Sequence, residues 1–380
     1  MNIQQINTPC YIVDENKLKS NLEILRSVEQ RSGAHILLAQ KAFSCFAVYP
    51  LIGSYISGTT ASGLYEARLG HEKMGRENHV FAPAYKDSDI DEIASICDHV
   101  IFNSANQLMH HKTRVLGRTS IGLRVNPEVS TQEDHAIYDP CAPGSRLGVT
   151  RANLDKALSE NPSLLDGVEG LHFHTLCEQN SDDLKTTWDE FERKFGDLLP
   201  SMKWINLGGG HHITRADYDI DLLISIITDI RTRYDVEVYL EPGEAIALNA
   251  GYLVTEVMDI VDNGIQVLIL DASAACHMPD VLEMPYRPPL QNSYTWDEGA
   301  PYKYRLSSMT CLAGDVIGDY AFDREIKIGD RLVFEDMAIY SMVKNNTFNG
   351  IPLPSIYLMR DGDCQLIREF GYKDFEERLS

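Results

Sequence analysis

Residues that could do chemistry follow several apolar, β-rich runs of the chain. Lys41 comes directly after the run 35–39, where partial burial would lower the pKa of its amine and prepare the amine for Schiff-base chemistry. Gly208 to Gly210 follow another run, and three glycines let backbone N–H groups converge on an anion such as a phosphate. Glu241 ends a third run, where a carboxylate can hold a proton on a ring nitrogen. Each feature alone also fits a plain structural role, as a surface lysine, a tight turn or a buried acid.

Histidines lie in the same part of the sequence. His172 and His174 alternate along one β-rich run, so their side chains point to the same face of a strand. With His211 they could in principle bind a metal, but no carboxylate or cysteine recurs at a spacing that would complete such a site. An imidazole can equally stack on a flat cofactor ring. We therefore expect no metal.

The elements that must position these residues are β-rich runs that alternate with amphipathic stretches up to about residue 245, as in βα units around a parallel sheet. The 200 residues from Lys41 to Glu241 hold seven units, or about 29 residues a unit, close to the roughly 31 of a (β/α)8 barrel. An open doubly wound sheet is less favoured, because its glycine-rich loop normally follows the first strand and here the glycines follow the seventh. The eight runs are 35–39, 55–59, 79–82, 99–103, 121–126, 168–175, 204–208 and 236–241.

In such a barrel the carboxyl ends of the strands meet at one mouth and build the active site. A lysine, a phosphate cradle, a carboxylate and a histidine would then converge there, which is what pyridoxal phosphate needs. Tyr340 could add a hydroxyl to the phosphate contacts. After Gly243 the chain changes to runs rich in Val, Ile and Tyr, which predict a second, mainly β domain. These later runs are 252–261, 266–270, 331–335, 355–360 and 364–369.

Composition excludes several classes of protein. The 380 residues carry 34 Lys and Arg against 56 Asp and Glu, a formal net charge of −22 that would repel nucleic acid and anionic membrane surfaces. No apolar run approaches the roughly 20 residues of a membrane span, and the first residues lack the features of a signal peptide. The eight cysteines are scattered without a CxxC pair, so neither a disulfide framework nor a structural zinc site is indicated. We expect a cytoplasmic protein with neither nucleic acid nor membrane as a partner.

Over nearly the whole chain, these motifs resemble the alanine racemase-like (fold type III) pyridoxal-phosphate enzymes, and within them the decarboxylases of basic amino acids. The motifs with Lys41, His174, Gly208 to Gly210 and Glu241-Pro242-Gly243 occur in that family's order, followed by Cys311 with Asp315 and by Tyr340 eight residues before Phe348-Asn349-Gly350. The resemblance is closer still to the carboxynorspermidine/carboxyspermidine decarboxylase branch. The segments that carry it are 271–280 (DASAACHMPD) and 310–315 (TCLAGD).

The resemblance implies a role for each cofactor-facing residue. Lys41 would carry pyridoxal 5'-phosphate, His174 would stack on its ring, and Glu241 would keep the pyridine nitrogen protonated. A protonated ring is a strong electron sink for decarboxylation, whereas racemases of this fold place an arginine at that position. The remaining implied cofactor contacts are Arg124, Gly209, Gly210 and Tyr340.

The resemblance also implies a homodimer with shared active sites. Cys311 is similar to the family cysteine that reaches the neighbouring subunit's site and returns a proton to the substrate carbon. The implied domains are a cofactor-binding barrel over 15–248 and a mainly β domain formed by 1–14 and 249–380. Cys311 would lie in the second of these.

Departures from the family pattern indicate the substrate. Glu244 stands where the commoner motif Glu-Pro-Gly-Arg has its arginine, which makes the pocket anionic. Leu312 follows Cys311 where the ornithine and diaminopimelate branches have an acid, so the substrate's terminal amine must be met elsewhere. A carboxylated triamine has a secondary amine as well as a terminal one, and acids can pair with both. Glu244, Asp280 and Asp315 are the acids that we expect to contact this cationic polyamine amino acid.

The sequence therefore predicts the decarboxylation of carboxynorspermidine or carboxyspermidine to norspermidine or spermidine, in polyamine biosynthesis. The alternatives are a racemase or a decarboxylase of another basic amino acid (diaminopimelate, ornithine or arginine) on the same fold, or a catalytically silent pyridoxal-phosphate-binding regulatory homologue. The preferred chain length stays open, because one methylene is worth only about 1–3 kcal/mol.

Overall fold

The chain folds as two units. The computed structural model describes residues 6–132 and 139–380, in which 21–246 form one unit and the N-terminal segment to Ser20 joins 247–380 in the other. The division falls inside α1 (Glu15–Ser32) and α9 (Glu244–Ala247). In the described part of the chain, no helix is both long enough and apolar enough to cross a membrane.

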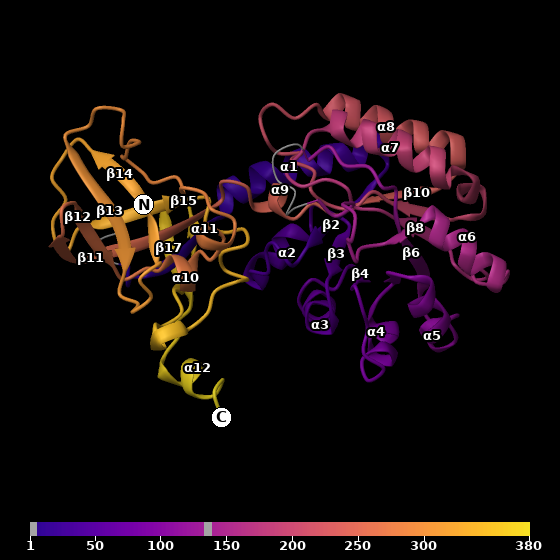
Figure 1. Cartoon of the computed structure of the whole chain (residues 1–380), viewed down its shortest axis with the longest axis horizontal. Coiled ribbons are helices and arrows are strands. Elements are labelled where there is room, and N and C mark those ends of the chain that lie inside the picture. Colours follow the sequence, from indigo (N-terminus) through magenta and orange to yellow (C-terminus); the bar gives the residue numbers. More distant parts are fainter. Residues whose placement is uncertain (1–5, 133–138) are drawn as a thin grey trace. The chain divides into compact units, whose positions relative to one another are not determined.

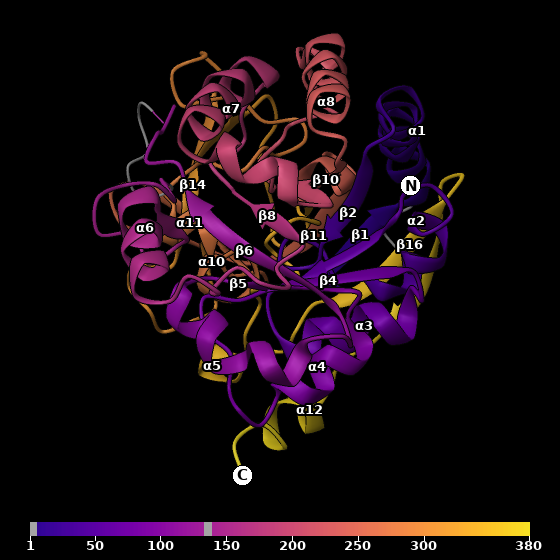
Figure 2. The same cartoon turned by 90° about the vertical axis from the view of Figure 1, so that its right-hand side faces the viewer.

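Unit 21–246 is a closed barrel of parallel strands. Its sheet runs in the order β5-β4-β3-β2-β10-β9-β8-β6, and β5 pairs with β6 to close the ring (Figure 2). A further short strand, β7 (Val149–Thr150), pairs only with β6. The eight strands of the ring are β2 (His35–Ala39), β3 (Gly58–Ala61), β4 (Glu77–Phe81), β5 (His99–Phe102), β6 (Ser120–Asn126), β8 (Gly170–His172), β9 (Trp204–Asn206) and β10 (Glu237–Leu240). The predicted (β/α)8 barrel is confirmed, although β3 begins three residues later than the run 55–59 suggested.

Helices surround this barrel (Figure 2). They bury one apolar face each, as α7 does with Leu184, Trp188, Phe191 and Phe195, which recur at helical spacing. Phe191 stacks on Phe173 at 4.7 Å between ring centroids, which joins the helix to the segment after β8. Between the strands lie α2 (Tyr49–Ile52), α3 (Leu64–Lys73), α4 (Ile90–Ile96), α5 (Ala105–Val115), α6 (Arg151–Glu160), α7 (Ser181–Phe195) and α8 (Ile220–Tyr234), with 3-10 turns at Phe46–Val48 and Gly196–Ser201.

Trp204, the first residue of β9, lies inside the barrel at the end where the strands begin. It packs with Leu37, Ile101 and Tyr239 in one buried cluster. Gly170 leaves room for the indole, because a Cβ there would lie 2.0 Å from Trp204 Cδ2. The size of the tryptophan therefore explains why the neighbouring strand position is a glycine.

The second unit is built on one sheet (Figure 1). Its strands run in the order β14-β13-β12-β11-β1-β16-β17, and β15 also pairs with the long strand β11. The N-terminal strand β1 lies between β11, to which it is antiparallel, and β16, to which it is parallel. The strands are β1 (Cys10–Asp14), β11 (Gly251–Asp262), β12 (Gln266–Leu270), β13 (Tyr302–Ser308), β14 (Val316–Phe322), β15 (Arg331–Glu335), β16 (Ser355–Arg360) and β17 (Asp363–Arg368), and the short helices are α10 (Ala274–His277), α11 (Asp280–Glu283), a 3-10 turn at Phe348–Gly350 and α12 (Tyr372–Glu376).

We predict that Gly170→Ala destabilises the protein by about 1–3 kcal/mol, because the new methyl group would overlap the indole of Trp204. The free energy of unfolding in urea measures this loss. Gly63→Ala is the matched control, since Gly63 is extended and a Cβ at that position would have no atom within 4 Å. Equal stability of the two variants would contradict the packing argument.

Candidate active site

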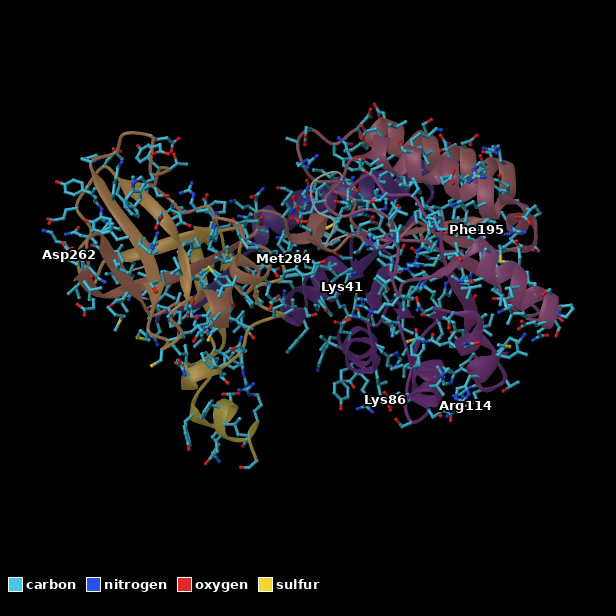
Figure 3. The ribbon with its side chains drawn as sticks, viewed as in Figure 1. Lys41, Lys86, Arg114, Phe195, Asp262 and Met284 are labelled. Carbon is cyan, nitrogen blue, oxygen red and sulfur yellow. The ribbon has the colours of Figure 1, made fainter. Side chains whose placement is uncertain are left out.

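Lys41 lies in the turn after β2, on the barrel unit (Figure 3). The Ala39 N–H donates to the carbonyl of Pro242 at 3.1 Å, and Gly243 lies against Ala42, so the turn is held to the segment after β10. The Lys41 side chain keeps an exposed surface, yet the protein around it removes enough water to lower the pKa of its amine. Arg124 lowers that pKa further, whereas Glu241 raises it.

Glu241 is a buried carboxylate at the end of β10, only 7% exposed. Its Oε1 accepts hydrogen bonds from Thr60 Oγ1 at 3.0 Å and from Asn206 Nδ2 at 2.8 Å, and His172 Nε2 lies 3.3 Å from its Oε2. Burial by itself would raise the pKa of Glu241, but His172, His79 and the Thr60 hydroxyl outweigh it and lower the pKa to about 2. The carboxylate is therefore ionised at neutral pH.

His174 faces the glycine loop that follows β9. The Gly209 N–H donates to His174 Nδ1 at 2.9 Å, which leaves the proton of a neutral ring on Nε2. Burial and the neighbouring charges of Lys41 and Arg124 hold the pKa of His174 well below its usual value, so the ring is neutral.

No side chain fits in the glycine loop. A Cβ on Gly209 would lie 2.5 Å from the carbonyl oxygen of Glu241, and one on Gly210 would lie 2.1 Å from that of Leu176. Gly208 and Gly210 also have positive φ angles, 74° and 82°. The loop thus offers bare backbone beside a neutral imidazole and an ionised acid, a cradle that fits the phosphate and ring of pyridoxal phosphate.

Arg124 completes the group of predicted residues that the barrel brings together. Its guanidinium lies 4.6 Å from the centre of the Phe81 ring, and Nη2 donates to the carbonyl of His174 at 3.4 Å. Burial lowers the pKa of Arg124 to about 10, so it stays charged at neutral pH. Lys41, Arg124, His174, Gly209 and Glu241 all interact with at least one other member of this group.

Sequence reasoning missed two residues that hold Glu241 in place. Thr60 is the next-to-last residue of β3 and Asn206 ends β9, and both donate to the same carboxylate oxygen. Asn206 Oδ1 also accepts from the Gly208 N–H at 2.8 Å, so one amide joins the acid to the glycine loop. A polar residue at the end of an apolar strand is the signal that would have indicated both of them.

The three histidines are not placed as a metal site. His172 contacts Glu241, His174 contacts Gly209, and His211 is buried with its pKa lowered by burial to about 4. In ranges 6–132 and 139–380, three groups of side chains have the spacing to hold a metal ion, and this trio is not one of them. One of the three groups includes Glu244, which lies 2.8 Å from His212.

Four further predicted residues belong to the β unit, namely Cys311, Tyr340, Asp280 and Asp315. Cys311 is exposed, and its backbone N–H donates to Asn349 Oδ1 at 2.7 Å. Asn349 has a left-handed backbone, with φ of 59°, in the 3-10 turn Phe348–Gly350. Tyr340 is half-buried and also left-handed, with φ of 53°. Asp280 forms an ion pair with Lys344, and Lys344 also contacts Glu283. The charge of Asp280 is therefore partly balanced within the unit.

Asp315, which the sequence predicts to contact substrate, is a buried acid surrounded by hydrogen-bond donors. It is 1% exposed and its oxygens accept from Ser273 Oγ at 2.6 Å, from Ser308 Oγ and Thr310 Oγ1 at 2.5 Å each, and from the Ala275 N–H at 3.1 Å. Although burial alone would raise the pKa of Asp315, these donors lower it. These partners hold the segment that carries Cys311, and the contact of Asp315 with substrate stays a prediction.

Comparisons with known proteins agree with a site that fits pyridoxal phosphate. A family model described as pyridoxal-dependent decarboxylase, C-terminal sheet domain, matches residues 10–338. The chain is 43% identical to a carboxynorspermidine/carboxyspermidine decarboxylase of Campylobacter jejuni subsp. jejuni over 99% of both chains. It is 41% identical to a carboxyaminopropylagmatine decarboxylase of Synechocystis over 99% of this chain and 96% of that one. The crystal structure of carboxynorspermidine decarboxylase from Campylobacter jejuni, complexed with norspermidine, has a TM-score of 0.90 at 43% identity and covers 98% of this chain and 100% of that chain.

We predict that Asn206→Ala weakens the binding of pyridoxal phosphate about ten- to a hundredfold, because a hydrogen bond to a charged group is worth about 1.5–3 kcal/mol and the Gly208 N–H loses its acceptor too. Absorbance titration of the apoprotein with the cofactor measures the change. Asn153→Ala, at an exposed position of α6, is the matched control. Unchanged affinity in Asn206→Ala would show that the amide does not organise the site.

Proposed function

The chain belongs to the pyridoxal-dependent decarboxylase family, and on that premise we propose that it converts carboxynorspermidine or carboxyspermidine to norspermidine or spermidine in cytoplasmic polyamine biosynthesis. The observation that carries the substrate class is Glu244, an acid directly after the Glu241-Pro242-Gly243 turn and set among further charged groups of the barrel. Full-length similarity to an enzyme named for these substrates supports it.

In this proposal the barrel holds the cofactor. Lys41 is its covalent anchor, and the lowered pKa of the amine favours the uncharged form that bond formation needs. His174 stacks on the ring as a neutral imidazole, and Gly209 and Gly210 receive the phosphate on bare backbone. Arg124, buried beside His174, and Tyr340 in the β unit are further cofactor contacts that we propose from the resemblance.

Glu241 decides the type of reaction. Bound pyridoxal phosphate accepts the electron pair that a departing carboxyl group leaves, and it does so best with its ring nitrogen protonated. Glu241 is ionised well below neutral pH and buried, so it can hold a proton on that nitrogen. A racemase is disfavoured, because such an enzyme of this fold places an arginine there.

Cys311 is proposed to supply the proton that replaces CO2 on the substrate carbon. Its exposure suits a residue that reaches a second copy of the chain, and Asn349 and the Asp315 network hold its loop. We therefore propose a two-fold homodimer, in which the barrel 15–248 binds the cofactor and the β domain, 1–14 with 249–380, contributes across the dimer.

A second candidate substrate is carboxyaminopropylagmatine, because a relative named for its decarboxylation is 41% identical over nearly the full chain. It also carries a carboxylated, cationic chain, but it ends in a planar guanidinium that prefers a carboxylate in bidentate geometry. An acidic pocket alone does not distinguish a guanidinium from an ammonium. The distinction needs a direct comparison of substrates.

Product analysis by mass spectrometry tests which substrate the protein decarboxylates. We expect the cofactor-loaded protein to release CO2 from carboxynorspermidine or carboxyspermidine, and Lys41→Ala to lose this activity. The same assay is run with carboxyaminopropylagmatine, ornithine, arginine and diaminopimelate. Turnover confined to the guanidino compound would select the second candidate, turnover confined to the simple amino acids would reject the polyamine substrate, and no turnover at all would favour a regulatory homologue.

We predict that Glu244→Ala raises KM for the carboxylated triamine by one to three orders of magnitude, at about 1.4 kcal/mol per tenfold, while kcat changes less. Asp280→Ala should raise KM in the same way, but by less, because Lys344 already balances part of its charge. Steady-state kinetics measure both values. Glu160→Ala, on the exposed end of α6, is the control, and a KM that matches the control would remove the tested acid from the substrate pocket.

A further inference from the structure

Glu244 lies beside two ionisable side chains, His212 and Glu178, that the proposed function does not use. His212 Nε2 lies 2.8 Å from Glu244 Oε2, and the two side chains are only 8% and 17% exposed. The carboxylate of Glu178 joins them, since one ligand atom from each of the three residues lies within 4.8 Å of the others. Two acids thus share a single imidazole.

Hydrogen bonds tie together the three loops that carry this cluster. Glu178 follows β8, His212 follows β9, and Glu244 begins α9 after β10. The Gln179 N–H donates to the carbonyl of Gly210 at 2.9 Å, and the His212 N–H donates to that of Gln179 at 3.2 Å. Thr214 Oγ1 donates to the carbonyl of Ala245 at 2.7 Å. The cluster is therefore set by the same loops that form the proposed cofactor cradle.

The cluster lies within electrostatic reach of Lys41. Burial is the main cause of the raised pKa of the Cys177 thiol, at about 11, and the charges of Glu178 and Glu244 raise it further. Lys41 acts on the same thiol in the opposite direction. Cys177 is therefore near both the lysine and the two acids, and a cation bound by these acids would be close to a molecule attached at Lys41.

The charges around His212 make its proton exchangeable for another cation. Burial lowers the pKa of His212, but the ion pair with Glu244 and the charge of Glu178 outweigh burial and raise it. Arg215 opposes them, with Nη1 3.3 Å from His212 Nδ1, and is itself paired with Asp217. A proton on the imidazole of His212 balances the charge of one of the two acids. When that proton is lost, both carboxylates can attract another positive group.

We propose that Glu178, His212 and Glu244 form a proton-linked subsite, in which an ammonium group of the substrate takes the place of the proton on His212. The inference rests on the proposed function and deepens it. The bound amine keeps its own proton, and His212 releases one proton to solvent as the amine binds. His212 is in this view a specificity-determining positioning residue, because it competes with the substrate for the two acids.

Calorimetry with norspermidine and the cofactor-loaded enzyme tests this subsite. Titration in two buffers of different ionisation enthalpy counts the protons released on binding. Below the pKa of His212 we expect the wild type to release up to one proton, and its affinity to rise up to tenfold per pH unit until His212 has lost its proton. A wild type that releases no proton overturns the proposal without any variant.

His212→Gln gives the independent check, because glutamine keeps a hydrogen-bond donor near Glu244 and carries no charge. We expect the variant to lose both the proton release and the pH dependence that His212 causes, with the cofactor absorbance unchanged. His110→Gln is the matched control, since His110 makes the same kind of contact, Nε2 to Asp87 Oδ1 at 2.8 Å, on exposed α5. Equal proton release in wild type and His212→Gln would overturn the proposal.

Two further outcomes separate this inference from its premises. If the wild type binds norspermidine no better than lysine, the proposed substrate and this subsite both fall, whereas tight binding without proton release removes only the subsite. Zn²⁺ titrated into the cofactor-loaded enzyme tests the other possible occupant. One-to-one binding of Zn²⁺ that His212→Gln abolishes would identify a metal site and overturn the proposal.

Discussion

The ionised carboxylate of Glu241 is the interaction on which the rest of the barrel mouth depends. A buried acid without partners would be neutral, and a neutral acid could not hold a proton on a cofactor nitrogen. Thr60, Asn206 and His172 provide the partners, and each comes from a different strand of the ring. Only a closed barrel brings the ends of β3, β8, β9 and β10 close enough to surround one side chain.

The same closure explains why the neighbouring loop is made of glycine. Asn206 binds both Glu241 and the Gly208 N–H, so the loop must pass directly beside the acid. Gly209 then runs against the backbone of Glu241, at a distance that no Cβ allows, and closely beside the ring of His174. The loop is thus shaped by the requirement to present backbone, with no side chain, next to an ionised group.

The charged groups at the mouth of the barrel shift the pKa values of their neighbours. Burial, together with the charges of Lys41 and Arg124, lowers the pKa of His174 and keeps the ring neutral, while Glu241 partly offsets the loss of hydration at Lys41. Near Cys177, the two acids Glu178 and Glu244 raise the pKa of His212. Positive groups therefore gather where a phosphate and a carboxylate are expected, and negative groups gather where we place the amines of the substrate. In the β unit, Asp315 and Asn349 fix the loop of Cys311 by accepting hydrogen bonds from Thr310 Oγ1 and from the Cys311 N–H.

The sequence by itself determined the barrel, the family and the chemical types at the mouth, because strand periodicity is local and residues such as Lys41 and Glu241 follow the strands directly. It did not predict β13 and β14, whose mixed polar and apolar residues become a sheet only by pairing with each other and with β12. It also missed Asn206 and Thr60, and it did not show that Ser273, 42 residues away along the chain, donates to Asp315. Which donors surround a carboxylate depends on contacts between distant segments, and these form only when the chain folds. The tertiary structure alone therefore decided which acids are surrounded by hydrogen-bond donors, as Asp315 is, and which pair with a basic side chain, as Asp280 does.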